Sequence, residues 1–216
     1  GTDLKFPHHE NEIAQNYCLH SDYLANYWVH NGRLDLRGEK MSKSLGNVVW
    51  LKDIIKEYHP NAFRLAILAN HYRQVINYQD DMMRQMQGEW EKIEKLYVSV
   101  FRNLELKNAL EGGKALDLMD EFLTEMAYDF NTANAITHLY ALMKKMNADI
   151  RRSDLDVSVL QDEFKTFKDM LYVLGVNVEV KSLSNEEKTL VIDWQNARKN
   201  KDFEKADLLR NKINEL

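Results

Sequence analysis

The sequence predicts a mainly helical protein, and three features of its pattern lead to this fold class. The chain has 216 residues, of which only two are proline and eight are glycine, so few positions break a helix. Apolar residues recur at steps of three and four from Leu51 onward, which is the spacing of one helix face. Short polar breaks separate these periodic segments, and helices joined by short connections form an antiparallel bundle.

Residues 1–50 are the exception, because turn-forming residues and a short alternating pattern gather there. The alternation covers residues 28–30 and 33–36. Asn31-Gly32 lies between the two stretches and is a favoured turn dipeptide. We therefore predict a hairpin, or an edge pair of strands, that turns at Asn31-Gly32.

The periodic part begins with a helix that Pro60 opens at its first position, after a break at His59. The next helix is long, and Asp80 or Asp81 is its expected N-cap. Gly112-Gly113 predicts a clear break after it. Its apolar stripe is Met83, Met86, Trp90, Ile93, Tyr97, Val100 and Leu104.

Two further stripes complete the predicted bundle, and Gly175 ends the second of them. The methionine and aromatic residues in all the stripes are expected to be core residues. The stripes are Ile136, Leu139, Met143, Met146 and Ile150, then Leu160, Phe164, Phe167, Leu171 and Leu174.

Two shorter helices follow a polar joint at residues 181–185, and they form a C-terminal hairpin rich in Lys and Arg. The first is marked by Leu190, Val191, Trp194 and Ala197, and the second by Phe203, Ala206, Leu209, Ile213 and Leu216.

Composition narrows the function classes. A net charge of −5 argues against a binder of nucleic acid that is covered in lysine, although a local basic stripe can still contact phosphates. The single cysteine, Cys18, excludes an internal disulfide and favours a reducing compartment, and no apolar run approaches the roughly 20 residues of a membrane span. We expect a soluble, cytoplasmic protein with no membrane partner. The opening segment 1–6 and the missing helix stop at Leu216 also predict a piece of a longer protein.

The strongest motif is Lys40-Met41-Ser42-Lys43-Ser44, followed by Leu45-Gly46-Asn47. Two lysines three residues apart, with two hydroxyls and a glycine, suit a loop that closes over a triphosphate. A cation that engages as charge builds on the leaving pyrophosphate lowers the barrier of the reaction. An ordinary polar surface loop is the alternative interpretation of the lysines and serines.

A second group of polar residues lies at the start, in Phe6-Pro7-His8-His9-Glu10-Asn11-Glu12. If a helix starts near Pro7, His8 and Glu12 lie one turn apart on the same face. An imidazole and a carboxylate placed in this way can share a zinc ion, but zinc normally takes about four ligands. A solvated polar helix start is the alternative.

The lysine pentapeptide is the signature of class I aminoacyl-tRNA synthetases. Together with Phe6–Gln15, some 25 residues before it, the motif resembles the cysteinyl-tRNA synthetase family. The resemblance covers essentially the whole chain but only the later half of the family's sequence. Its further landmarks are residues 26–32, His71-Tyr72-Arg73 with Asn77-Tyr78, Asp129-Phe130-Asn131-Thr132, and the run from Ala197 to Arg210.

The resemblance implies an ATP-dependent cysteine–tRNA ligase with Mg²⁺, L-cysteine, ATP and tRNA(Cys) as its ligands. Lys40 and Lys43 would be catalytic and would bind ATP together with Ser42 and Ser44. One Zn²⁺ would be held by His8 and Glu12 and by two cysteines outside this chain, where it binds the thiolate of the substrate. The missing N-terminal half would be a partner, and the chain alone would be inactive.

In the C-terminal run, the resemblance implies anticodon contacts by Arg198, Phe203, Asp207 and Arg210. An aromatic ring gives a base a stacking surface, while Arg and Asp read base edges. Phe203 stands where the family more often has Trp, and a core position is the alternative for this residue.

The implied architecture has four parts. Residues 1–37 would be the end of a Rossmann-type catalytic domain with half of the zinc site, and 38–79 the lysine-loop subdomain with stem-contact helices. Residues 80–180 would be the helical bundle and 181–216 the anticodon-binding helical hairpin. Two rivals stay open: a related ATP-dependent cysteine ligase with a non-tRNA acceptor, and a non-catalytic tRNA-binding module.

Overall fold

The computed structural model describes residues 1–41, 46–152, 154 and 156–214, and it is mainly helical. Ser42, Lys43 and Ser44 of the lysine motif therefore lie outside the described residues, as does Leu216 of the last apolar stripe. The elements, in chain order, are η1 (Thr2–Leu4), η2 (Lys5–His9), α1 (Glu10–His20), β1 (Leu34–Leu36), β2 (Glu39–Lys40), α2 (Leu51–Glu57), α3 (Pro60–Leu68), β3 (Ile76–Tyr78), α4 (Asp80–Leu106), α5 (Leu118–Ala127), α6 (Thr132–Asp149), α7 (Val157–Val173), α8 (Asn185–Lys199) and α9 (Phe203–Asn214).

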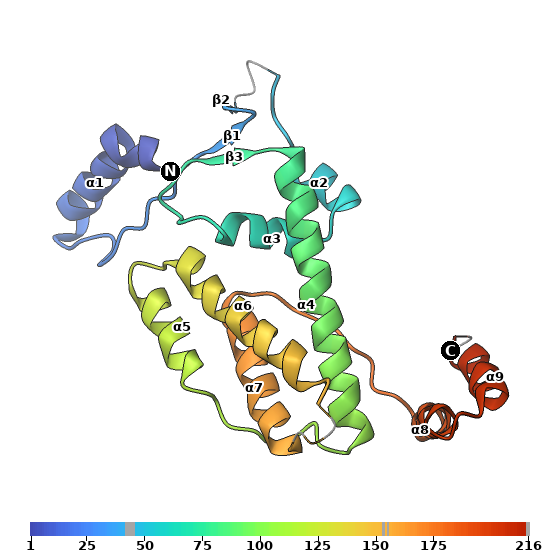
Figure 1. The fold of residues 1–216 in the computed structure, drawn as a ribbon. Coiled ribbons are helices and arrows are strands. Elements are labelled where there is room, and N and C mark those ends of the chain that lie inside the picture. The colour runs from blue at the N-terminus through green and yellow to red at the C-terminus, as the bar shows by residue number, and fades with distance from the viewer. Residues whose placement is uncertain (42–45, 153, 155, 215–216) are drawn as a thin grey trace.

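Helix α4 is long and central, and the other parts are arranged along it (Figure 1). Its beginning lies beside α2, α3 and the small sheet, and its end lies beside the bundle helices α6 and α7. The N-terminal arm, residues 1–27 with α1, projects on one side. The α8–α9 hairpin lies apart from the bundle at the end of an extended segment.

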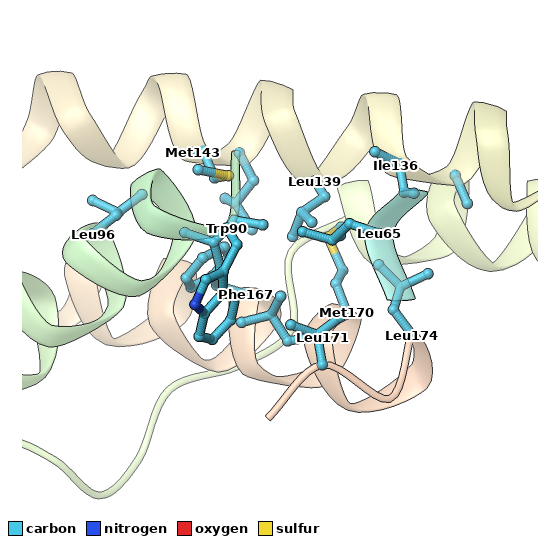
Figure 2. Packing of buried hydrophobic residues seen from close by; sticks show 14 of the residues in the cluster. Leu65, Trp90, Leu96, Ile136, Leu139, Met143, Phe167, Met170, Leu171 and Leu174 are labelled. Atoms are coloured by element: carbon cyan, nitrogen blue, oxygen red, sulfur yellow. The ribbon is translucent and has the colours of Figure 1, made fainter. Parts of the chain in front are cut away.

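The bundle core comes from the predicted apolar stripes. Trp90 of α4, Leu139 of α6 and Phe167 of α7 point toward one another (Figure 2), and each is at most 2% exposed. Met86 and Tyr97 are only partly buried, at the edge of the same cluster. The prediction that methionines and aromatics form the core is thus confirmed for most of the stripe. Helix α5, which the sequence pattern did not locate, adds the fully buried Phe122, and its ten residues give few repeats of the helical period.

The predicted hairpin at Asn31-Gly32 is wrong, because residues 28–30 form no strand. The chain turns at Arg37-Gly38 instead, where both residues have positive φ (52° and 86°) and join β1 to β2, as a two-residue hairpin turn requires. Gly32 serves a close approach: a Cβ there would lie 1.9 Å from the carbonyl oxygen of Gln74.

The sheet has the order β2-β1-β3, with β2 antiparallel and β3 parallel to β1. Strand β3 leads directly into α4, so the sheet connects the β1–β2 hairpin, which precedes the lysine loop, to α4.

The helix boundaries mostly follow the predicted signals. Pro60 opens α3, and the ring of His59 accepts a hydrogen bond from the Asn61 amide. The predicted cap of α4 is wrong: Gln79 is the N-cap, and Asp80 and Asp81 lie in the first turn, where carboxylates stabilise the positive end of the helix dipole. No helix in the described ranges is long and apolar enough to cross a membrane.

Candidate functional site

The base of the lysine loop is tied on both sides. Lys40 ends β2 with an exposed side chain. The Asn47 side chain, beyond the loop, donates a hydrogen bond to the Lys40 carbonyl oxygen at 3.1 Å. In the turn between β1 and β2, the Gly38 amide donates to Asn77 Oδ1 at 2.7 Å. Lys40 and Asn47, which lie on either side of residues 41–46, are therefore held together beside the sheet.

The candidate zinc ligands lie on the N-terminal arm. His8 is in η2 and Glu12 is in the first turn of α1, and both side chains are exposed. Within the described ranges, no group of three or more His, Cys, Asp or Glu residues could hold a metal ion. Cys18 is exposed with a free thiol. The arm thus presents an exposed imidazole and an exposed carboxylate at the two predicted positions.

The neighbouring histidine lies in a ring cluster of its own. His9 Nδ1 is 2.9 Å from His30 Nε2, and both rings lie beside Trp28. Desolvation lowers the pKa of His30, and the nearby Lys5 lowers it further. The cluster holds the arm against the segment that leads to β1.

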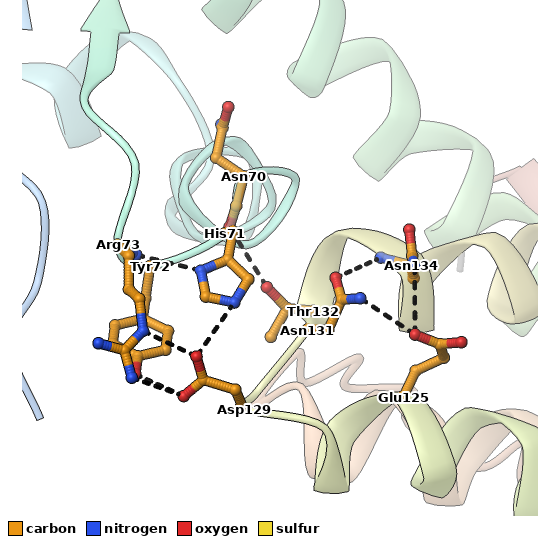
Figure 3. Close-up of polar contacts among 9 residues, drawn as sticks. All are labelled: Asn70, His71, Tyr72, Arg73, Glu125, Asp129, Asn131, Thr132 and Asn134. Carbon is orange, nitrogen blue, oxygen red and sulfur yellow. Dashed lines mark hydrogen bonds and ion pairs between the residues drawn. The ribbon is translucent and has the colours of Figure 1, made fainter.

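A polar network joins the segment after α3 to the turn between α5 and α6, at the family landmarks found in the sequence (Figure 3). Asp129 accepts hydrogen bonds from Arg73 Nε at 2.7 Å and Nη2 at 3.0 Å, and from the Tyr72 hydroxyl at 2.7 Å. His71 Nε2 lies 3.7 Å from the same carboxylate. The Arg73 and Tyr72 hydrogen bonds hold the pKa of Asp129 down at about 2.

The rest of the network caps α6 and connects it to α3. Asn131 is the N-cap and accepts from the Asn134 amide, and Glu125 Oε2 accepts from both asparagine side chains. Thr132 Oγ1 donates to the Leu68 carbonyl at 2.7 Å. This landmark therefore fixes the bundle to the layer that carries the lysine loop.

The structure brings the four predicted anticodon residues together. Arg198 of α8 and Phe203, Asp207 and Arg210 of α9 line a hollow of about 530 Å³ between the two helices, together with Trp194 and Ala206. Phe203 is 67% exposed, so the alternative of a core position is wrong for this residue. The hollow combines an exposed ring, two guanidinium groups and one carboxylate.

A buried carboxylate that sequence reasoning missed anchors this hairpin to the bundle. Glu105, at the end of α4, is 1% exposed and accepts a hydrogen bond from the Leu183 amide at 2.8 Å. Arg102 lies 2.6 Å and Lys188 of α8 3.8 Å from its oxygens. Spacing along the chain indicates only one of these pairs, since Arg102 and Glu105 are neighbours on one helix face.

Comparison with known families matches residues 1–88 to tRNA synthetases class I (C) catalytic domain and residues 121–179 to the DALR domain. A protein of Acholeplasma laidlawii named cysteine–tRNA ligase is 40% identical over 97% of this chain and 46% of its own length. A protein of the same name from Anoxybacillus flavithermus is 38% identical over 99% of this chain and 47% of its own. The chain thus spans about half the length of the curated relatives it matches.

Among solved structures, the ternary complex of Agrobacterium radiobacter K84 agnB2 LeuRS with tRNA and LeuAMS is similar, with a TM-score of 0.65. The identity is 18%, and the match covers 79% of this chain and 24% of that one, so this likeness concerns the fold alone. The two family models thus match the chain in order, a class I synthetase catalytic domain in its first part and a DALR domain in the helical bundle. The predicted fold class and the predicted resemblance to the later half of cysteinyl-tRNA synthetases are confirmed.

Proposed function

We propose that this chain, homologous along nearly its whole length to cysteine–tRNA ligases, is the C-terminal half of such an enzyme. The whole enzyme would use ATP to convert L-cysteine to cysteinyl-adenylate and would then esterify the 3′ end of tRNA(Cys). The observation that carries the proposal is the 40% identity over 97% of the chain. The complete lysine motif at residues 40–44 supports it.

In this proposal, Lys43 and secondarily Lys40 stabilise the phosphates of Mg²⁺-bound ATP, and Ser42 and Ser44 contact the nucleotide. The negative charge that collects on the leaving pyrophosphate is greatest in the transition state. A lysine ammonium that reaches it at that moment raises kcat more than it tightens ATP binding. The exposed Lys40 and the Asn47 hydrogen bond at the base of the loop are compatible with such a closing segment.

His8 and Glu12 fit half of a zinc site. An imidazole nitrogen and a carboxylate oxygen are ligands that zinc accepts, and neither side chain has another polar partner within the described ranges. Two thiolates from outside the chain would complete about four ligands. When bound, zinc would hold the thiolate of the cysteine substrate and so favour it over serine, whose hydroxyl is a harder ligand.

The α8–α9 hairpin would read the anticodon of tRNA(Cys) through its hollow. Phe203 would stack on a base, and Arg198, Asp207 and Arg210 would pair with base edges. The joint at Glu105 supports this role, because a fixed hairpin reaches the anticodon in one orientation relative to the lysine loop.

The N-terminal arm would be covered by the other half of the enzyme. Its large apolar side chains are open to solvent: Phe6 is 79%, Tyr23 69% and Tyr27 89% exposed. Exposed apolar side chains gathered on one segment mark a surface that another protein surface covers.

The division into parts at residues 37, 79 and 180 and a cytoplasmic location belong to the same proposal.

The test is to mix this chain with a separately produced N-terminal half and to measure zinc content and aminoacylation. We expect activity with about one zinc per complex, and its loss in His8→Ala and in Lys43→Ala. Lys165→Ala, which removes a surface ion pair with Asp169, is the matched control and should leave activity unchanged.

Two outcomes would contradict the proposal. Halves that associate and bind zinc but never charge tRNA would point to a cysteine ligase with another acceptor, or to a module that only binds tRNA. Pyrophosphate exchange by this chain alone would contradict the need for a second half.

A further inference from the structure

We propose that Trp194 is a positioning residue of the hairpin, which holds the Arg198 guanidinium as a flat stacking surface for one unpaired base of the bound RNA. This inference rests on the proposed function of the hairpin and adds a residue outside the four predicted anticodon contacts. Trp194 acts through Arg198 and has no direct contact with the RNA in this account.

The geometry comes from one helix face. Trp194 and Arg198 are four residues apart on α8, and the guanidinium carbon lies over the indole ring at 5.0 Å from its centroid. Both residues line the same hollow as Phe203. A guanidinium on an aromatic ring is held by the ring's negative face, and its opposite plane can stack on a base.

Arg198 is available for such a contact. The residue is exposed, and within the described ranges it has no ion pair with a carboxylate, although Asp207 lines the same hollow. The indole is therefore the group that fixes its orientation. Orienting a long, flexible side chain before binding reduces the entropy that binding must overcome.

Trp194 is not one of the buried residues of the hairpin. In the described part of the hairpin, the buried residues are the small Ala197 and Ala206, at 5% and 4% exposed. Trp90 in the bundle is different: it is 2% exposed, and its buried ring stacks on the ring of His59. Trp194 is only partly buried, and its ring faces a hollow and a cation.

The experiment is a double-mutant cycle on binding of the tRNA(Cys) anticodon stem–loop, measured with the parent chain, Trp194→Leu, Arg198→Ala and the double variant. We expect Trp194→Leu to weaken binding about two- to fivefold, the equivalent of roughly 0.5 to 1 kcal/mol for an exposed cation–π pair. In the Arg198→Ala background the same change should cause no further loss, since the two residues act as a unit.

The controls separate orientation from folding and from charge. Trp194→Phe keeps a ring face and should bind more tightly than Trp194→Leu, and Arg198→Lys keeps the charge without the plane and should bind more weakly than the parent. Trp50→Leu removes another tryptophan that lies beside a cation, Lys52, outside the hairpin, and should leave binding unchanged. Circular dichroism checks that each variant keeps its helices.

Equal losses from Trp194→Leu with and without Arg198, or no loss at all, would overturn the inference while leaving the anticodon role of the hairpin intact. A parent chain that binds this stem–loop no better than one with an altered anticodon would instead refute the proposed function, and this inference with it.

Discussion

The bundle and the C-terminal hairpin are both built from amphipathic helices, but they use their aromatic residues in opposite ways. In the bundle, Phe122 and Phe167 are fully buried. In the hairpin, Phe203 is 67% exposed, and the buried apolar residues of its described part are two alanines. The difference indicates that the aromatic rings of the bundle stabilise its core, whereas the hairpin leaves the ring of Phe203 exposed to solvent.

The two regions meet at a polar joint. Arg102 donates to the Lys181 carbonyl at 2.6 Å, and Glu105 accepts from the Leu183 amide. Ser184 then opens α8 with a capping box that includes Glu187. Because the α8–α9 hairpin has little core of its own, these directed contacts fix its position on the bundle.

The largest effect should come from exchanging a phenylalanine for alanine in each region. Phe167→Ala is expected to lower the free energy of unfolding by about 3–5 kcal/mol, since it leaves a cavity in the core. Phe203→Ala should change it by no more than about 0.5 kcal/mol, but should weaken stem–loop binding by about 1–3 kcal/mol through lost stacking. Urea unfolding and RNA binding of both variants would measure this. Equal losses of stability would remove the contrast between the two regions.

A smaller loss is expected at the joint. Glu105→Ala leaves Arg102, Lys188 and the Leu183 amide without their shared acceptor. The free energy of unfolding should fall by about 2–3 kcal/mol. Limited proteolysis should become faster at residues 181–184 than elsewhere. Asp169→Ala removes the surface pair with Lys165 and is the control, with an expected effect below about 1 kcal/mol. Unchanged cleavage at 181–184 in Glu105→Ala would show that the joint does not fix the hairpin.

Glu163 tests the bundle core through its pH dependence. Its carboxylate is buried against Lys145 at 2.9 Å, and desolvation raises its pKa. Because the folded state binds this proton more tightly than the unfolded state, stability falls as the pH rises above about 4.5. Glu163→Gln removes this cost of burying charge. At pH 7 its free energy of unfolding should equal that of the parent or exceed it by up to about 1 kcal/mol. Unfolding measured from pH 4 to pH 8 would contradict this if the variant were less stable by a constant amount.

Asp129 should show the opposite linkage at the exposed network. Its pKa is lowered to about 2, so its contribution is complete above the ordinary value of 3.8 and is lost as the pH falls toward 2. Asp129→Asn should be slightly less stable than the parent at neutral pH, and the difference should vanish in acid. Asp169→Asn, at the surface pair with Lys165, is the control. A difference that persists at pH 2 would exclude the ion pair as its cause.

The sequence predicted the regions governed by period and local signals. Apolar steps located α4, α6 and α7, and Pro60 and Gly175 marked helix ends. The predicted β-hairpin at Asn31-Gly32 is wrong because this dipeptide has a turn signature, whereas Gly32 is constrained by its close contact with residues 73–74, far away in the chain. For the same reason Glu105 was missed: its partners at 183 and 188 are known only once the chain folds.

Within the candidate site, the resemblance supplied residues that spacing alone could not group. The hollow brings Arg198, Phe203 and Asp207 together, but the roles of these residues, of His8 with Glu12, and of the lysine motif remain predictions. Trp194 could have been found from its position one helical turn before Arg198.

The most direct test of the contrast between the bundle and the α8–α9 hairpin is binding of full-length tRNA(Cys) to this chain, in competition with the same tRNA carrying one altered anticodon base. A hairpin that reads base edges predicts a loss of about tenfold or more for the altered tRNA, and Phe203→Ala should reduce that preference. Equal affinity for the two tRNAs would contradict the account and would leave the hairpin without a reading role.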